Sequence, residues 1–323
     1  MRFIDPPVDV LRKPSAMTRT IVVGVDGLGP SKVALKWATA RASLGACELL
    51  IVHVVDDAAG TMNAAMLNDQ SGQAQQMLDE CMVRASELRP DVRVRSTLLT
   101  GDVVVELAAT SERATMLVIG TNKTGFINGT VFGGRSLQIA AAATAPAVIV
   151  PEVPRQIRKG ILVGVDDSAV GRAAIEFGAQ EAELRRQPLT LLHGGERHGA
   201  AQEWTPDAAS ERTGVQLEIL ANALILARRH TTGEIRTRRV SRPAAEALLD
   251  ASSSAEAVVV GCSRRTGQER NILGSVSHDL IINCRCPTVV IHENARSATS
   301  ALVGAGERDY RSADRRESES TSS

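Results

Sequence analysis

The sequence of 323 residues carries one pattern twice, and this repeat limits what the chain can fold into more than any other feature. The segment Gly24-Val25-Asp26 returns as Gly164-Val165-Asp166, an offset of 140 residues (166 − 26). Four more pairs follow in the same order, at offsets of 140 or 141 residues: His53 and His193, Gly120 and Gly261, Gly133 and Gly274, Pro146 and Pro287. Repeats of about 20–50 residues are typical of solenoids, whereas a repeat of domain size indicates that a whole fold was duplicated.

Within each repeat, short apolar runs alternate with segments of helical pattern. In the first repeat the expected strands are 20–25, 48–55, 92–99, 117–119 and 147–150, and the expected helices are 31–44, 72–88, 103–111 and 136–143. In the second repeat, a strand at 258–260, a helix from Val276 and a strand at 288–291 follow the same order. Strands that alternate with helices favour a parallel sheet with right-handed crossovers. We therefore predict an α/β chain of two tandem, doubly wound, five-stranded parallel sheets with helices on both faces and a flavodoxin-like topology.

Local patterns refine this prediction. Asp102 can cap the helix that follows it, whereas the polar segment 56–70 is expected to be irregular. Apolar and polar residues alternate over 92–99, which is typical of a half-buried edge strand. The basic run Arg236, Arg238 and Arg239 is interpreted as charge on another edge strand, which discourages unwanted pairing, in preference to a nucleic-acid contact.

The repeats also set the expected domain limits. We predict a flexible N-terminal arm (1–17), a first domain (18–151), a linker (152–158), a second domain (159–293) and a disordered C-terminal tail (294–323). The arm lacks periodicity, and the tail is rich in Ser, Arg and Glu with few apolar residues.

Composition excludes several classes of function. Hydrophobic residues make up 43% and charged residues 23%, as in soluble globular proteins. Aromatic residues are only 2% and the net charge is zero, which argues against a stacking platform or a basic field for nucleic acid. The sequence has no apolar run of the roughly 20 residues that cross a bilayer, no secretory signal and no disulfide framework among its five cysteines. We expect a cytoplasmic protein without membrane or nucleic-acid partners.

The most specific chemistry follows the fourth strand of each repeat. In open α/β sheets, ligands bind at the carboxyl ends of strands where the winding direction reverses. Two corresponding sets of residues follow the fourth strands: Gly120, Lys123, Gly133, Gly134 and Ser136 in the first repeat, and Gly261, Arg264, Gly274, Ser275 and Ser277 in the second. A glycine at a strand end can let a base or ribose approach the backbone, and free N–H groups at a helix start can hold a phosphate. From the residues alone, phosphate binding and simple shaping of the loop are equally supported.

Other motifs point to less specific roles. The turn from Gly27 to Lys32 lacks the order of glycines that a Walker loop or a dinucleotide fingerprint requires. His53 and His193 are interpreted as structural hydrogen-bond partners at strand ends. The consecutive residues 277–279 (Ser-His-Asp) cannot form a catalytic triad through adjacency alone.

A zinc site is also disfavoured, so no metal site is predicted. Its candidate ligands would be Cys262, His278, Cys284, Cys286 and His292. They include no paired C-x2-C sets, and one of the cysteines precedes a turn proline.

With these repeated motifs, the sequence resembles the universal stress protein family in its tandem two-domain form, which is common in actinobacteria. The resemblance covers roughly 18–151 and 159–293. It rests on Gly-Val-Asp after strand one, His-Val after strand two, the Gly-x2-Gly-x9-Gly-Ser/Thr loop, and Cys/Ala-Pro before the last strand. It implies an adenine nucleotide alpha hydrolase-like fold in each half.

The resemblance also implies a ligand, because members of the ATP-binding branch hold adenine and ribose near the strand-one Asp and phosphates on the glycine loop. The implied contacts in the first half are Gly24, Asp26, Val54, Gly120, Lys123, Gly133 and Ser136. Those in the second half are Gly164, Asp166, Gly194, Gly261, Arg264, Gly274, Ser275 and Ser277. ATP, with magnesium, is thus the implied ligand.

Both halves depart from the family motif. Lys123 and Arg264 stand where the loop has its second glycine, and Gly134 replaces the usual hydroxyl residue. Gly194 lacks the side chain that would touch adenine. A lysine or arginine in the loop would either crowd the phosphates or bring a positive charge to them.

We therefore predict an ATP-responsive regulatory module that acts in stress response through an unidentified protein partner. No nucleophile–base pair marks it as an enzyme, although slow ATP hydrolysis stays open. The alternative is a scaffold of the same fold that works through protein contacts alone. The last strands, 147–150 and 288–291, are apolar sheet edges, so we expect the two halves to pair through them, as the resemblance also implies, and a homodimer to use the same edges.

Overall fold

The computed structural model describes residues 19–121, 134–153, 156–195, 206–262 and 273–292, with residues 206–212 described for the backbone alone. The first half contains the strands β1 (Thr20–Gly24), β2 (Glu48–Asp56), β3 (Val94–Gly101), β4 (Met116–Thr121) and β5 (Ala147–Pro151). Its helices are α1 (Gly29–Leu44), α2 (Ala64–Leu88), α3 (Val103–Ser111) and α4 (Gly134–Ala142). The predicted arm and tail, together with Lys123, Gly133 and Arg264, lie outside the described residues.

The second half repeats this order. Its strands are β6 (Ile161–Gly164), β7 (Leu189–Gly195), β8 (Ile235–Pro243), β9 (Ala257–Cys262) and β10 (Thr288–His292). Its helices are α5 (Ala169–Arg185), α6 (Pro206–Ala227), α7 (Ala244–Ser252) and α8 (Ser275–Asn283). None of the helices in the described parts of the chain is long and apolar enough to cross a membrane.

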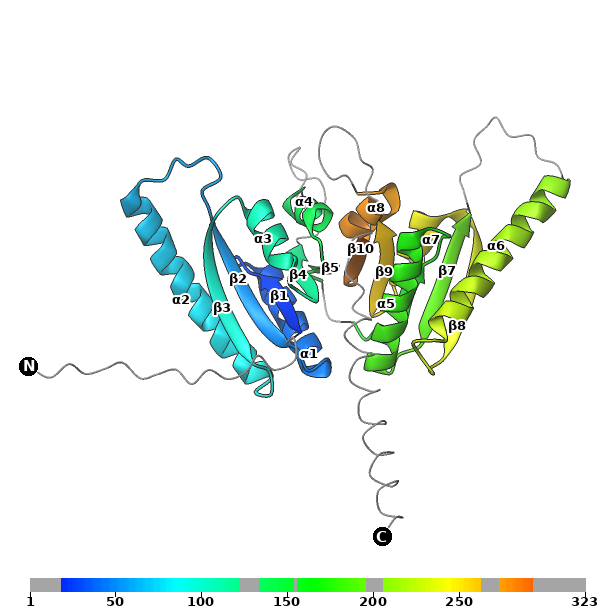
Figure 1. Cartoon of the computed structure of the whole chain (residues 1–323), viewed down its shortest axis with the longest axis horizontal. Helices are drawn as coiled ribbons and strands as arrows, with labels where there is room; N and C mark the ends of the chain where they lie inside the picture. The colour runs from blue at the N-terminus through cyan, green and yellow to red at the C-terminus, as the bar shows by residue number, and fades with distance from the viewer. Residues whose placement is uncertain (1–18, 122–133, 154–155, 196–205, 263–272, 293–323) are drawn as a thin grey trace, which may run out of the picture.

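All ten strands form one sheet, in the order β3-β2-β1-β4-β5-β10-β9-β6-β7-β8 (Figure 1). Strands are parallel within each half, and the halves join where β5 and β10 pair antiparallel. The predicted pairing of the two last strands is therefore confirmed, as is the prediction of two doubly wound five-stranded units. β3 and β8 form the outer edges, as their alternating and basic sequences indicated.

In the structure, β5 and β10 pair with each other inside one chain. A homodimer through these edges stays a prediction.

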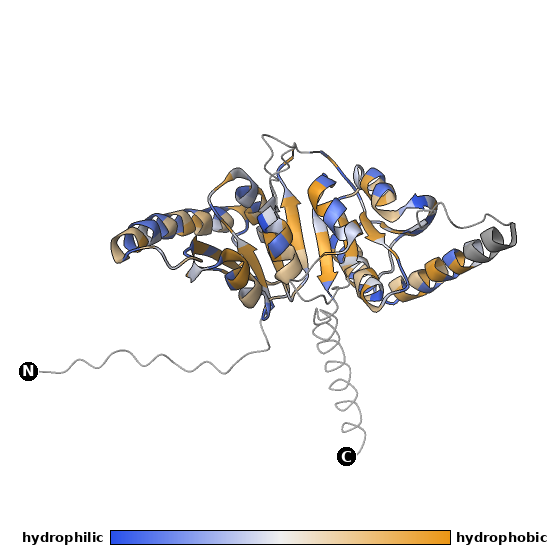
Figure 2. Cartoon of the chain, turned by 90° about the horizontal axis from the view of Figure 1, so that it is seen from above, coloured by the Kyte–Doolittle hydropathy of each residue, from blue (hydrophilic) through white to orange (hydrophobic). Residues whose placement is uncertain are grey.

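Helices cover both faces of the sheet, so the inner strands are buried on both sides. Ile21 and Val23 pack on the face covered by α1 and α2, whereas Val22 packs on the face covered by α3 and α4. The same division holds for the second half, with α5 and α6 on one face and α7 and α8 on the other. Figure 2 shows the central strands in hydrophobic colours and hydrophilic residues on the helices around them.

One helix, α2, begins much earlier than predicted. α2 starts at Ala64 and not near Gly72, so the prediction of an irregular segment up to Gln70 is wrong. The side chain of Asn63 caps the helix by accepting a hydrogen bond from the Met66 N–H at 2.9 Å. The first two turns are largely exposed, so they lack the apolar periodicity by which a helix is recognised in sequence.

Candidate functional site

A cavity of about 620 Å³ opens in the first half at the carboxyl ends of β1, β2 and β4. Its walls come from these strands and from α1, α2, α3 and α4. The sheet order β3-β2-β1-β4-β5 reverses its winding between β1 and β4, and this is the place where open α/β sheets bind ligands. The size lies within the roughly 300–1,000 Å³ of small-molecule pockets. We call this space the first-half cavity.

The structure brings the described first-half candidates together. The wall of the first-half cavity includes all five of them: Gly24, Asp26, Val54, Gly120 and Ser136. They come from β1 and the turn after it, from β2, from β4 and from the first turn of α4, so tertiary folding and not sequence proximity assembles the set.

The turn after β1 is held by the residues that the repeat pattern marks. Asp26 is exposed, and its Oδ1 accepts a hydrogen bond from the Leu28 N–H at 3.0 Å. The Nδ1 atom of His53 lies 2.7 Å from the Val25 carbonyl oxygen, and Nδ1 of His193 lies 2.8 Å from the Val165 carbonyl oxygen. The interpretation of both histidines as structural hydrogen-bond partners at strand ends is confirmed.

Gly120 is required by packing between α1 and β4. A Cβ atom at Gly120 would lie 2.4 Å from the carbonyl carbon and oxygen of Pro30, closer than any real Cβ approaches backbone. In the second half, a Cβ at Gly261 would lie 2.9 Å from the Val170 carbonyl carbon. Of the two roles left open by the sequence, the described backbone supports the shaping of the fold for these glycines. Gly120 nevertheless remains part of the cavity wall.

Sequence reasoning missed two charged residues of the cavity wall. Arg135 lies in the first turn of α4, and its Nη2 contacts Asp56 Oδ2 at 2.8 Å. Both side chains are partly exposed, at 63% and 42%. Asp56 ends β2, so the rule that sites lie at the carboxyl ends of strands could have found it. Arg135 stands between two predicted residues but carries no motif of its own.

The contribution of α2 was also missed. Gln70, Gln73, Ala74 and Met77 line the cavity from this helix. No sequence signal indicated that this part of the chain folds back over the end of the sheet. Ser136, which was predicted, donates from Oγ to the Gly120 carbonyl oxygen at 3.3 Å.

The second half places its candidates differently. Asp166 Oδ1 accepts hydrogen bonds from the Ser168 hydroxyl at 2.6 Å and the Ser168 N–H at 3.1 Å. Ser277 donates to the Gly261 carbonyl oxygen at 3.4 Å, which repeats the contact of Ser136. Gly164 ends β6, Gly274 immediately precedes α8, and Ser275 is the first residue of that helix.

In the second half, α7 lies directly against β7 at Gly194. A Cβ at Gly194 would lie 2.4 Å from the Ala244 Cα atom, so α7 approaches β7 directly at this residue. α7 begins immediately after β8, and the pairing of β7 with β8 shifts register between Gly194 and Gly195. In the first half, Asp102 stands between β3 and α3. Packing against α7 therefore explains why residue 194 is a glycine, and the lost adenine contact stays a prediction.

The cysteines form no larger cluster in the described structure. Cys284 Sγ lies 3.4 Å from Cys286 Sγ, and both residues are buried. The Nε2 atom of His292 lies 2.7 Å from the Ala140 carbonyl oxygen. Across the described ranges, no group of three or more His, Cys, Asp or Glu side chains is arranged to hold a metal ion.

Comparison with known proteins identifies related chains. The family model described as Universal stress protein family matches residues 17–151 and 158–292. The universal stress proteins Rv1996 of Mycobacterium tuberculosis and Mb2019 of Mycobacterium bovis are each 27% identical over 297 residues, covering 84% of this chain and 94% of theirs. The crystal structure of a universal stress protein from Archaeoglobus fulgidus aligns with a TM-score of 0.64 at 18% identity, covering 84% of this chain and 98% of that one.

Proposed function

The chain belongs to the universal stress protein family, and from this premise we propose that its first half binds an adenine nucleotide in the first-half cavity and that binding regulates its action in stress response. Members of the family are stress-response proteins and are generally regulatory. The proposal goes further in naming the ligand class, the half that binds it and a role without catalysis.

The single observation that carries the proposal is the location of the first-half cavity. It opens where the winding of the sheet reverses, and five described residues marked by the family resemblance lie on its wall. Apolar groups such as Met77 and Leu107 offer contact surface for a base. Exposed Asp26 offers a carboxylate that can accept hydrogen bonds from ribose hydroxyls.

The phosphates would lie toward α4. Free N–H groups at the start of a helix attract anions, and α4 begins at Gly134 beside the cavity. Arg135 in the same turn can offer a guanidinium to a phosphate, in exchange for its contact with Asp56. This charge compensates for the hydroxyl group that Gly134 lacks.

The second half serves a different role in this proposal. Ala244 of α7 lies directly against Gly194, the residue that corresponds to Val54 on the wall of the first-half cavity. Asp166 is also engaged by the Ser168 hydroxyl. The second half then contributes the pairing partner for the first half and no nucleotide site.

Calorimetric titration with ATP and magnesium tests the proposal, preceded by identification of any nucleotide that copurifies. We expect binding to the intact chain with one site, loss of binding in Asp26→Ala, and unchanged binding in the matched control Asp166→Ala. Absence of binding at millimolar ATP refutes the proposal. Two sites, or loss in Asp166→Ala alone, refutes the assignment to the first half.

A scaffold without a nucleotide is the second candidate function. It is favoured by exposed apolar side chains on α6, where Leu217 and Ile225 are 54% and 59% exposed. Apolar side chains that form a contiguous exposed patch are typical of protein-contact surfaces. A chain that fails to bind ATP but loses a cellular partner when Leu217 and Ile225 are replaced by serine would be a scaffold.

A further inference from the structure

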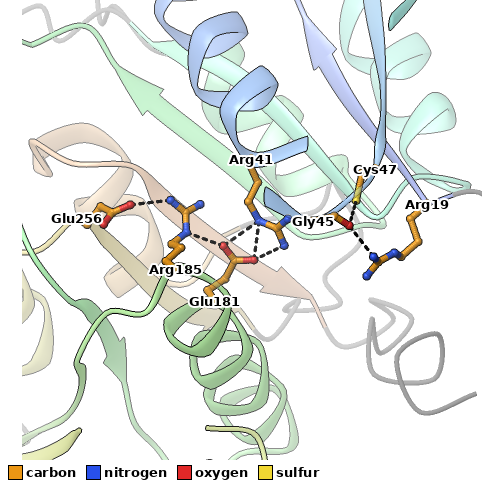
Figure 3. Close-up of polar contacts among 7 residues, drawn as sticks. All are labelled: Arg19, Arg41, Gly45, Cys47, Glu181, Arg185 and Glu256. Carbon is orange, nitrogen blue, oxygen red and sulfur yellow. Dashed lines mark hydrogen bonds and ion pairs between the residues drawn. The ribbon is translucent and has the colours of Figure 1, made fainter. Parts of the chain in front are cut away.

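We infer that the buried ion pair between Arg41 and Glu181 specifies pairing between unlike halves: a first half accepts a second half, from the same chain or another copy, and rejects another first half. The inference concerns the surface along which the two halves meet and is independent of nucleotide binding. Figure 3 shows the residues involved.

Arg41 and Glu181 are equivalent residues of the two repeats. They are separated by 140 residues, which is the offset of the repeat in this part of the sequence. Arg41 Nε donates to Glu181 Oε1 at 2.8 Å, and Nη2 donates to the same oxygen at 2.5 Å. Two equivalent residues that touch each other must lie close to the pseudo-twofold axis that relates the halves.

The strand contact shows the same symmetry. Val148 pairs with Val289, its equivalent at an offset of 141 residues (289 − 148). The flanking pairs, Ile149 with Thr288 and Ala147 with Val290, exchange equivalent positions about this pair. Because the central pair is valine against valine, the strand contact alone would serve two first halves as well as it serves unlike halves.

The charges break this symmetry. Arg185 donates to Glu181 from Nε at 2.9 Å and to Glu256 from Nη1 at 2.7 Å, and it lies over the ring of Trp37 at 5.1 Å. The first-half equivalent of Arg185 is Gly45 (185 − 140), where a Cβ would lie within 2.3 Å of the Arg41 guanidinium. In the first half, Gly45 leaves room for the Arg41 guanidinium at the axis. In the second half, the equivalent residue is Arg185, which adds a second positive charge beside Glu181.

Burial makes the charge pattern decisive. The side chains of Arg41, Glu181 and Arg185 are only 10%, 7% and 8% exposed. Burial acts to raise the pKa of Glu181, but the charges of Arg41 and Arg185 outweigh it and hold the pKa below its usual value. Glu181 is therefore ionised at neutral pH. A charge buried without its partner is strongly unfavourable.

Pairing of two first halves would bring Arg41 against Arg41 at the axis, with glycine where the second half has Arg185. No carboxylate of the described interface would remain to neutralise them. Two second halves would bring Glu181 against Glu181, but each would keep its own Arg185 as a partner. Rejection is therefore strongest between two first halves.

The test uses the full chain with a protease site inserted before Ile157, a residue that is 96% exposed. After cleavage, native mass spectrometry distinguishes pairs of unlike halves from pairs of like halves by mass. We expect the wild type to give only pairs of unlike halves. Arg41→Glu should weaken that pairing at least about 30-fold, because truncated or reversed partners of buried charge pairs lose this much or more.

Arg84→Glu is the matched control, since it reverses an exposed arginine that pairs with Glu87 on α2. The double variant Arg41→Met/Glu181→Met keeps side-chain volume but removes the charges at the axis. It should retain pairing of unlike halves and also allow pairs of first halves. This variant tests the inference if circular dichroism shows that Arg41→Glu does not fold.

Three results would overturn the inference. One is that cleaved wild-type halves separate or form pairs of first halves. Another is that Arg41→Glu pairs as well as Arg84→Glu. The third is that the double variant still rejects pairs of first halves.

Discussion

Gly120→Ala separates the two roles that the sequence left open for the glycine loop. The added methyl group would lie 2.4 Å from the Pro30 carbonyl group, whereas ordinary contacts begin at 3.4 Å. Backbone of α1 or β4 must therefore move by about 1 Å. Overpacking of this kind costs about 1–3 kcal/mol, partly offset by about 0.4–1 kcal/mol from the lower entropy of the unfolded chain. We expect a net loss of roughly 1–2 kcal/mol in the free energy of unfolding.

Urea unfolding followed by circular dichroism measures this loss, with an unchanged slope indicating that the folded state stays intact. Gly134→Ala is the matched control, because a Cβ there meets nothing within 4 Å. Gly134 is the first residue of α4, so alanine should leave stability equal to or above that of the wild type. The reasoning is refuted if Gly120→Ala is as stable as Gly134→Ala.

Three further predictions rest on single contacts. Glu181→Gln leaves Arg41 buried without an anion and leaves Arg185 with Glu256 alone, so it should lower the free energy of unfolding by about 3–5 kcal/mol at neutral pH. Urea unfolding measures this loss, and a change no larger than that of exposed Glu87→Gln contradicts the prediction. The native pKa of Glu181 lies below its usual value, so the ionised side chain stabilises the fold above the unfolded pKa, and this stabilisation is lost as the pH falls through the native pKa. Plots of unfolding free energy against pH for the wild type and Glu181→Gln should therefore converge in acid. Parallel plots argue against this prediction. Asp102→Ala removes the acceptor for the Val104 and Val105 N–H groups at 2.8 and 3.0 Å and should cost about 1 kcal/mol, which thermal unfolding would detect as a lower Tm.

Local chemistry explains where sequence reasoning succeeded. α3 begins at Val103 after the Asp102 cap and ends at Ser111, as predicted, because both its cap and its apolar pattern are short-range signals. β3 lies at the edge of the sheet, as its alternating pattern indicated. α2 was predicted eight residues too short, because its first turns are largely exposed and carry no apolar periodicity.

The candidate site was predictable only in part. Asp26 and Gly120 could be placed at one edge of the sheet because parallel strands bring their carboxyl ends together. Arg135 and the α2 residues Gln73 and Met77 could not, since their place on the cavity wall depends on how two helices pack over that edge.

The sequence by itself determined that one fold occurs twice, which elements make it and which strand ends carry its polar groups, because hydrophobic periodicity, caps and repeat offsets are properties of neighbouring residues. It even places Arg41 and Glu181 at equivalent positions. Only the tertiary structure decided that these two residues meet at the axis, that Gly120 and Gly194 accommodate helices, and that a cavity opens at the carboxyl ends of the first-half strands. These outcomes depend on distances of a few ångströms between segments far apart in the chain, and no local pattern records such distances.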